Sequence, residues 1–313
     1  MRICSLVPGA TEVVAALGLA DRLVGISHEC DFPAAVRHAP IMVEAAMSSD
    51  MTDSAEIDHR VKALMDSGRP LYRLNEQAFA NARPDLILTQ DLCDVCAVTP
   101  SQLGRAIHSL TVPPYLMTLH PSSLGDVISD VERIGKALGR ASKGRELAQS
   151  LHRRIAAVRT RSASLRTRPR VICLEWLSPL YIGGHWIPEM VTLAGGQDML
   201  GRMNQPSRQV TWDEVRAADP AIVLVMPCGF SVARTVTELE SLCRTAGDWS
   251  HALASWPKVY VVDAGSYFSR PGPRLVDGVE LLADIFSGTI SSGYDSAILR
   301  EISGTSFLIG PSS

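Results

Sequence analysis

The sequence predicts an α/β protein built from two lobes. Three observations lead to this prediction. Short apolar runs of strand length alternate with helical stretches of about ten residues, which is typical of βαβ units and parallel sheets. This alternation occurs twice along the chain, and a long proline-free helical stretch separates the two occurrences. The length of 313 residues suits two units of ordinary domain size.

In the first half, apolar runs and helical periodicity alternate from the first residues onward, and residues 28–69 carry a weaker pattern. Gly18 suits the end of the first helix. The predicted strands are 3–7, 23–27, 70–74, 86–89 and 114–119. The predicted helices are 11–17, 76–81 and 101–110.

From 124 to 165 apolar residues recur at spacings of three and four, which predicts one long helix or two helices joined near 139–144. The strand and helix pattern then resumes. The predicted strands are 171–174, 222–226 and 259–262, and the predicted helices are 188–194, 212–217, 232–244 and 274–286. The Ser/Gly-rich end of the chain is predicted to be loose.

These elements predict Rossmann-like lobes with parallel sheets at 1–121 and 167–287, bridged by a long rigid helix at 122–166 and followed by a loose tail at 288–313. In open α/β sheets, ligands lie beyond the carboxyl ends of the strands. We therefore expect the loops that follow the strands to line a ligand cleft between the lobes.

Composition excludes several classes of protein. Hydrophobic residues make up 46% and charged residues 20%, so disorder is excluded. The net charge of −3 offers no basic face for nucleic acid. Basic residues crowd between 133 and 168, which we interpret as the solvated face of a helix.

The amino terminus reads as a strand and not as a secretory leader, and no apolar run reaches the length of about 18 residues that a membrane span needs. Without a leader, the seven cysteines are expected to be reduced thiols. The sequence therefore predicts a cytoplasmic protein, or a periplasmic one if a leader precedes this numbering.

At the predicted loops the sequence resembles the substrate-binding proteins of cobalamin and iron-chelate uptake, in the branch of cobalamin-binding proteins. The segments that carry the resemblance are SLVPGATE at 5–12, GISHECDFP at 25–33, PDLILTQ at 84–90, GGHWIPEM at 183–190, LAGG at 193–196, WDEV at 212–215 and ADP at 218–220. The resemblance implies two lobes bridged by a rigid helix, a small-molecule ligand, no catalysis, and delivery to an ABC permease if the protein is exported. The leading hypothesis is a soluble protein that binds a cobalamin-type corrinoid for storage, chaperoning, sensing or uptake.

A corrin ring has broad apolar faces and a rim of amides, so flat aromatic side chains and a few polar groups suit it. Glu175 and His185 are expected to bind amide or nucleotide groups, and Arg270 to meet a phosphate or simply begin a helix. The predicted ligand-binding residues are Pro8, Ala10, Thr11, His28, Glu29, Tyr72, Gln90, Glu175, Trp176, His185, Trp186, Tyr267, Phe268 and Arg270.

A second hypothesis is a metal-dependent enzyme on the same fold. Its iron or zinc would be held by His28, Cys30, Cys93 and Cys96, since imidazole and thiolate are the usual ligands of such metals. The alternative interpretation of Cys93 and Cys96 is a pair of ordinary buried thiols. No Ser-His-Asp order or phosphate-binding glycine loop accompanies them, so the sequence favours a protein without catalytic activity.

Overall fold

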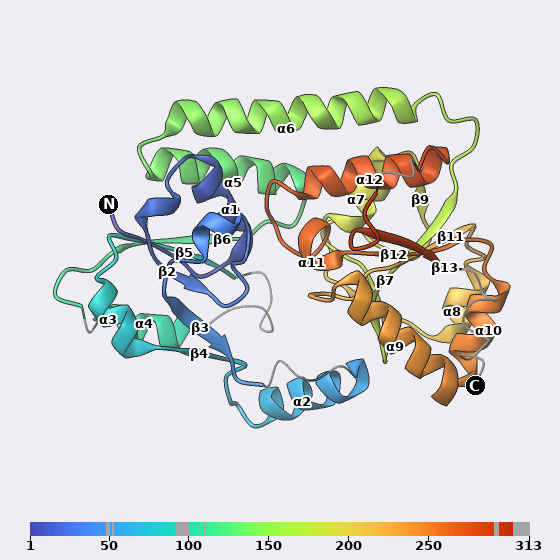
Figure 1. The fold of residues 1–313 in the computed structure, drawn as a ribbon, viewed down its shortest axis with the longest axis horizontal. Helices are drawn as coiled ribbons and strands as arrows, with labels where there is room; N and C mark the ends of the chain where they lie inside the picture. Colours follow the sequence, from blue (N-terminus) through green and yellow to red (C-terminus); the bar gives the residue numbers. More distant parts are fainter. Residues whose placement is uncertain (48–50, 52, 92–99, 109, 291–293, 303–313) are drawn as a thin grey trace. The chain divides into compact units, whose positions relative to one another are not determined.

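The computed structural model describes residues 1–47, 51, 53–91, 100–108, 110–290 and 294–302. The chain forms two compact units, each with its own sheet and covering helices (Figure 1). Unit 1 comprises Met1–Met51, His59–His152 and Arg270–Pro273, and unit 2 comprises Thr52–Asp58, Arg153–Ser269 and Arg274–Ser313. The predicted α/β fold class with two lobes is confirmed.

The sheet of unit 1 has the strand order β4-β3-β2-β1-β5-β6, and its strands are parallel except for the β3–β4 pair. The chain order reverses between β1 and β5, the kind of position where ligands bind in open α/β sheets. The strands are β1 (Ile3–Ser5), β2 (Leu23–Ser27), β3 (Ile41–Ala45), β4 (Tyr72–Leu74), β5 (Leu86–Gln90) and β6 (Tyr115–Leu119).

One hydrophobic core of unit 1 includes Cys4 and Ile87 from the strands, Phe79 from the first and Leu103 from the second of the two helices that follow β4 and β5. The helices of unit 1 bury further apolar side chains, such as Val13 and Val131. They are α1 (Pro8–Ala16), α3 (Glu76–Ala82), α4 (Pro100–His108) and α5 (Leu124–Ala137), with short 3-10 turns at Ala20–Arg22 and Ala34–Val36. The prediction missed β3 and helix α2 (Ser54–Asp66). Its apolar residues Ile57, Val61 and Leu64 recur at spacings of four and three, but they are only half-buried among exposed polar neighbours, so the signal is weak.

The stretch predicted as a bridging helix forms two helices, α5 and α6 (Ala141–Ser162). The backbone of Gly139 between them has a φ of +68°, in the left-handed region that ends helices at glycine. The single long helix is therefore wrong, and the alternative of two joined helices is confirmed. The division between the units falls at His152 and Arg153, within α6.

The sheet of unit 2 is mixed, with the order β10-β8-β7-β11-β12-β13 and β9 paired to β7. Strands β7, β9, β11 and β12 run parallel, whereas β8, β10 and β13 pair antiparallel to their neighbours. The strands are β7 (Arg170–Leu177), β8 (Leu180–Ile182), β9 (Gln197–Asp198), β10 (Arg208–Gln209), β11 (Ile222–Val225), β12 (Val259–Val262) and β13 (Leu299–Ile302).

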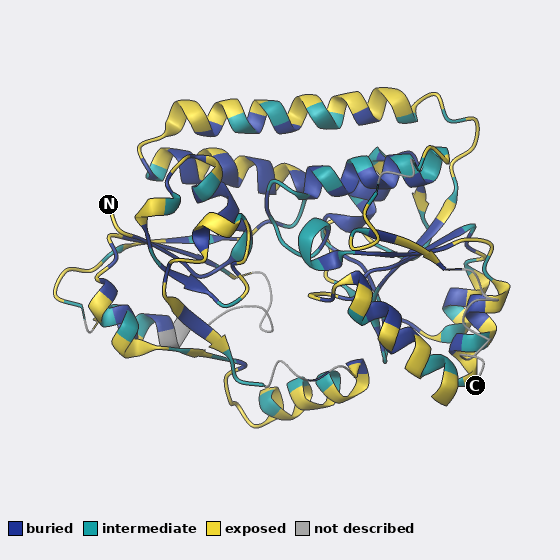
Figure 2. Ribbon diagram, in the orientation of Figure 1, coloured by how far each residue is buried: buried dark blue, intermediate teal, exposed yellow. Residues whose placement is uncertain are grey.

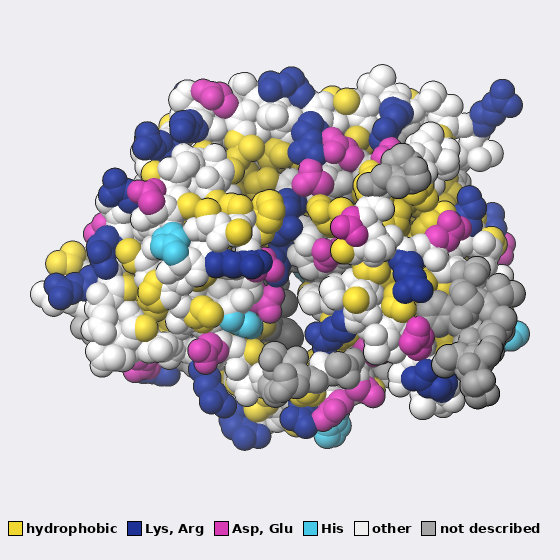
Figure 3. Space-filling model, viewed as in Figure 1, with side chains coloured by type: hydrophobic (Ala, Val, Ile, Leu, Met, Phe, Trp, Pro, Cys, Tyr) yellow, Lys and Arg dark blue, Asp and Glu magenta, His cyan; other side chains and the backbone are white. Residues whose placement is uncertain are grey.

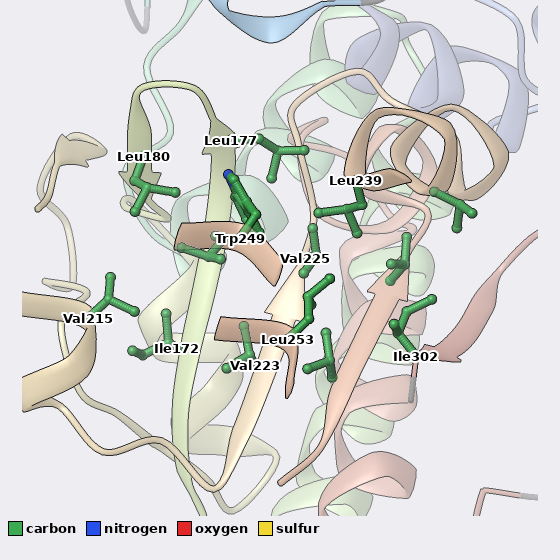
Figure 4. Close-up of a cluster of buried hydrophobic side chains, with 14 of the residues drawn as sticks. Ile172, Leu177, Leu180, Val215, Val223, Val225, Leu239, Trp249, Leu253 and Ile302 are labelled. Carbon is green, nitrogen blue, oxygen red and sulfur yellow. The ribbon is translucent and has the colours of Figure 1, made fainter. Parts of the chain in front are cut away.

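The prediction of a loose tail at 288–313 is wrong at β13, because this strand hydrogen-bonds to β12 and buries Leu299 and Ile302. The core of unit 2 gathers side chains from the central strands, such as Ile172 and Val223, and from helices, such as Leu239 and Trp249 (Figure 4). The helices are α7 (Ile187–Leu193), α8 (Trp212–Ala217), α9 (Val232–Thr245), α10 (Gly247–Ser255), α11 (Ala264–Tyr267) and α12 (Leu275–Ser287).

Burial follows the layers of each unit: the central strands are buried, and α6 is largely exposed (Figure 2). On the visible surface, basic and acidic side chains are interspersed (Figure 3). Within the described ranges, no helix is long and apolar enough to cross a membrane.

Candidate functional site

In unit 1, most of the predicted site residues follow the carboxyl ends of β1 and β2, whereas Tyr72 lies in β4 and Gln90 ends β5. Helix α1 begins at Pro8, directly after β1, and its first turn packs against the returning segment Arg270–Pro273. The packing is close: a Cβ added to Gly9 would lie 2.0 Å from the carbonyl oxygen of Pro271. This contact brings Arg270 to the loop that follows β2.

Arg270 forms ion pairs with two carboxylates of that loop. Its Nη1 lies 2.5 Å from Asp31 Oδ1, its Nη2 lies 3.3 Å from Glu29 Oε2, and only 13% of the Arg270 side chain is exposed. The buried carboxylate of Glu12 adds a third negative charge nearby. The cluster therefore has more carboxylates than guanidinium groups, and a phosphate would have to displace Glu29 or Asp31 to pair with Arg270.

His28 has partners at both ring nitrogens. Nδ1 lies 3.0 Å from the carbonyl oxygen of Val43, and Nε2 lies 3.3 Å from Glu29 Oε1. The hydrogen bond with Glu29 raises the pKa of His28 against the opposing effect of burial, and the same bond lowers the pKa of Glu29. The ring of Tyr72 lies 5.9 Å from the imidazole. Both ring nitrogens of His28 are therefore engaged, and a metal could bind only by displacing Glu29 or the Val43 carbonyl.

The His28–Glu29 pair predicts a pH dependence of stability. Because the folded-state pKa of His28 is raised, its contribution is present below the ordinary value of 6.5 and is lost as pH rises through the raised value. The lowered pKa of Glu29 gives a contribution present above 4.5 and lost as pH falls through the lowered value. We expect the melting-temperature advantage of the natural protein over His28→Asn to shrink as pH rises from about 6 to about 9.

The matched control is His185→Asn. Burial lowers the pKa of His185, so its contribution to stability should instead grow as pH rises from the lowered value to 6.5 and stay level above it. Melting curves of both variants across this range give the comparison. A difference for His28→Asn that stays constant with pH would contradict the assigned pairing.

Several predicted residues of unit 1 are internal. Thr11 and Ala10 are 0% and 1% exposed. Thr11 Oγ1 donates to Ser5 Oγ at 2.8 Å and lies 3.0 Å from Cys30 Sγ. Burial raises the pKa of Cys30 to about 11, so this cysteine is a thiol at neutral pH. The structure therefore places Ala10, Thr11 and Cys30 inside the unit, and leaves Pro8, Tyr72 and Gln90 half-buried.

The metal hypothesis receives no support in the described part of the chain. Among those residues, no group of three or more His, Cys, Asp or Glu side chains is placed to hold a metal ion. His28 and Cys30 are engaged as described above. Cys93 and Cys96 lie outside the described residues, so the full set of four is not tested.

In unit 2, Glu175 and His185 belong to one hydrogen-bonded turn. Glu175 Oε2 accepts from Ser207 Oγ at 2.7 Å and from the backbone N–H of Gly184 at 3.3 Å. Burial raises the pKa of Glu175. The His185 N–H donates to the Gln205 carbonyl at 2.6 Å, and its φ is +51°. Glu175 and His185 therefore connect residues 183–185 to residues 205–207 through hydrogen bonds.

The aromatic residues of unit 2 divide into two groups. Trp186 and Phe268 are only 3% and 2% exposed, and Trp186 Nε1 donates to the Phe268 carbonyl at 2.7 Å. Both side chains therefore pack inside the unit, and their contact with a ligand stays a prediction. Trp176 and Tyr267 remain half-buried. Trp176 contacts the ring of Phe230 edge-on, with centroids 5.3 Å apart.

The predicted ligand-binding residues did not include Asp31, Ser207 or Phe230, which the structure places in these clusters. Asp31 follows His28 and Glu29 within the segment that carried the resemblance, so its position gave a usable signal. Ser207 and Phe230 lie in stretches without such a pattern, and only the fold brings them to Glu175 and Trp176.

The two α/β units with polar clusters after their strands define a binding protein of the substrate-binding class. The periplasmic binding protein family matches residues 3–247, and the chain belongs to this family. This membership confirms the predicted substrate-binding protein fold.

The chain is 24% identical over 283 residues to a vitamin B12-binding protein of Vibrio parahaemolyticus, covering 89% of this chain and 86% of that protein. It is 25% identical over 291 residues to an uncharacterised ABC transporter substrate-binding lipoprotein of Bacillus subtilis, covering 90% and 79%. A periplasmic heme-binding protein of Pseudomonas aeruginosa has a TM-score of 0.71 at 16% identity, over 96% of this chain and 98% of that one. That last likeness concerns the fold alone.

The comparisons do not support the predicted cytoplasmic location. The family is described as periplasmic, and one relative is a lipoprotein. They agree with the periplasmic alternative.

Proposed function

We propose that this protein binds a cobalamin-type corrinoid outside the cytoplasm and presents it to an ABC permease. The vitamin B12-binding relative spans most of both chains, which supports this ligand class. The lipoprotein relative supports both the ABC partner and the export.

The observation that carries the ligand assignment is the carboxylate-rich cluster of unit 1. Glu29, Asp31 and Glu12 surround the single guanidinium of Arg270, so hydrogen-bond acceptors outnumber the donors. The rim of a corrin ring carries amides, whose N–H groups are hydrogen-bond donors. Acceptors held in place by Arg270 suit such a rim better than they suit the carboxylates of a haem, which would meet like charges.

The state of His28 also favours a corrinoid over haem. A haem-binding histidine must be neutral to bind iron, whereas Glu29 and Val43 hold His28 through both nitrogens and raise its pKa. A corrinoid that arrives with its own axial ligands needs no such base. On this view His28 contributes hydrogen bonding to the site and leaves the metal of the ligand untouched.

The test is a titration of the purified protein with cyanocobalamin and, separately, with haemin. We expect cobalamin to bind at least about tenfold more tightly, a difference of about 1.4 kcal/mol. The cobalamin spectrum should keep the bands of its own axial ligands. Calorimetry and absorbance check the two statements. Tighter binding of haemin with a new axial-ligand band would overturn the proposal in favour of haem.

A further inference from the structure

A short segment from the first half of the chain is anchored on unit 2. Residues 52–58 belong to unit 2, although Met1–Met51 before them and His59–His152 after them belong to unit 1. The structure describes residues 53–58 of this stretch, which we call the 53–58 segment. Helix α2 begins within it, at Ser54. The chain thus contributes one turn of a helix to the other unit, and two contacts fix it there.

The first contact is with Glu238 on α9. Glu238 Oε1 accepts from the backbone N–H of Ser54 at 2.8 Å. Ser54 is 0% exposed and Glu238 is 5% exposed. A carboxylate at the first turn of a helix satisfies a free N–H group and interacts favourably with the helix dipole. Glu238 therefore acts as an anchor for the start of α2.

The second contact is with Trp176, a residue of the predicted ligand site. The Trp176 indole Nε1 donates to the Ser54 carbonyl at 3.2 Å. The indole is also packed against Phe230, and the guanidinium of Arg234 lies 3.5 Å from the centre of the Phe230 ring. The same residue, Ser54, is thus bonded through its N–H to Glu238 and through its carbonyl to Trp176.

Burial raises the pKa of Glu238, a sign of a carboxylate with little solvent around it. Asp53 adds to this rise and Arg234 opposes it. Glu238 Oε2 has no hydrogen-bond partner among the described residues, so the bond from Ser54 is the main compensation for its burial that the structure records. Loss of that bond would leave a buried acceptor unsatisfied, which makes the anchored position of the segment strongly preferred.

We infer that Glu238 is a positioning residue for ligand binding: by holding Ser54 against Trp176, it makes the 53–58 segment a gate that slows ligand exchange at that indole. The inference rests on the proposed function, because it assigns Trp176 to the ligand site. A gate that must open for entry and for release affects both rate constants, and it changes the equilibrium constant much less.

The experiment measures cyanocobalamin binding by stopped-flow fluorescence in the full chain. Glu238→Ala should raise the association and dissociation rate constants by about tenfold each, with a dissociation constant within about threefold of the natural value. Glu238→Gln keeps a carbonyl oxygen for the Ser54 N–H and should restore both rate constants to within about twofold.

The matched control is Glu214→Ala. Glu214 also accepts from a backbone N–H at the start of a helix of unit 2, at 2.9 Å from the Thr211 nitrogen, and it lies in a different element, α8. This variant should lower stability without changing either rate constant. Hydrogen exchange gives a readout that needs no ligand: Glu238→Ala should speed exchange in peptides covering 53–58, and Glu214→Ala should not.

The outcomes separate the two proposals. Uptake of cobalamin with unchanged rate constants in Glu238→Ala would overturn the gate and leave the proposed function standing. No uptake by the natural protein would overturn the proposed function and the gate together, while the exchange data would still decide whether Glu238 anchors the segment.

Discussion

Replacing Trp186 by Ala is expected to destabilise unit 2 by about 3–5 kcal/mol, the usual cost of removing a large buried aromatic side chain. The side chain is 3% exposed, and its indole N–H donates to the Phe268 carbonyl at 2.7 Å. Truncation leaves both a cavity and a buried carbonyl without its donor. Chemical denaturation, with unit 2 followed by tryptophan fluorescence, measures the loss.

Trp186→Phe is the control that separates the two effects. It keeps most of the buried volume and removes the N–H donor, so it should cost about 1–3 kcal/mol. Trp212→Phe is a second comparison, because Trp212 packs with Trp249 and Trp256 and not with the Phe268 carbonyl. A Trp186→Ala protein with unchanged stability and weakened ligand binding would contradict the buried role and restore the sequence-based expectation.

The strands that the sequence indicates most directly are the continuous apolar ones. The runs at 86–89, 222–226 and 259–262 became β5, β11 and β12, because strands buried on both faces need apolar side chains throughout. Strand β13 reads LREI and carries charges on its exposed positions, so only its pairing with β12 reveals it. The short strands β9 and β10 depend wholly on neighbours that are distant in sequence.

In the candidate site too, local sequence predicted some features, and contacts between distant residues determine the others. His28, Glu29 and Arg270 were predicted from loops that follow strands, and the structure brings them together. What the sequence could not show is that Arg270 returns to unit 1 and pairs with Asp31, because the two are 239 residues apart. Trp186 and Phe268 were expected at the surface because they lie near loops. They are buried, with Trp186 bonded to the Phe268 carbonyl and Phe268 lying near Gly278 of α12.

Gly9→Ala is expected to destabilise unit 1 by about 3 kcal/mol, at the upper end of the cost of overpacking. The added methyl group would lie 2.0 Å from the Pro271 carbonyl oxygen and 2.5 Å from its carbon. Both are backbone atoms, so no side chain can rotate away. The returning segment Arg270–Pro273 would have to move off α1, and it would carry Arg270 away from Glu29 and Asp31.

Gly104→Ala is the matched control, because a Cβ at Gly104 would meet no atom within 4 Å. In helix α4 this change should stabilise the protein by about 0.5–1 kcal/mol through the better helix propensity of alanine. Denaturant titrations of the two variants measure both effects. Because Arg270 no longer holds Glu29 and Asp31 in place in Gly9→Ala, cobalamin affinity should fall in that variant only. Equal stability of Gly9→Ala and the natural protein would show that the returning segment does not pack on α1 as the structure has it.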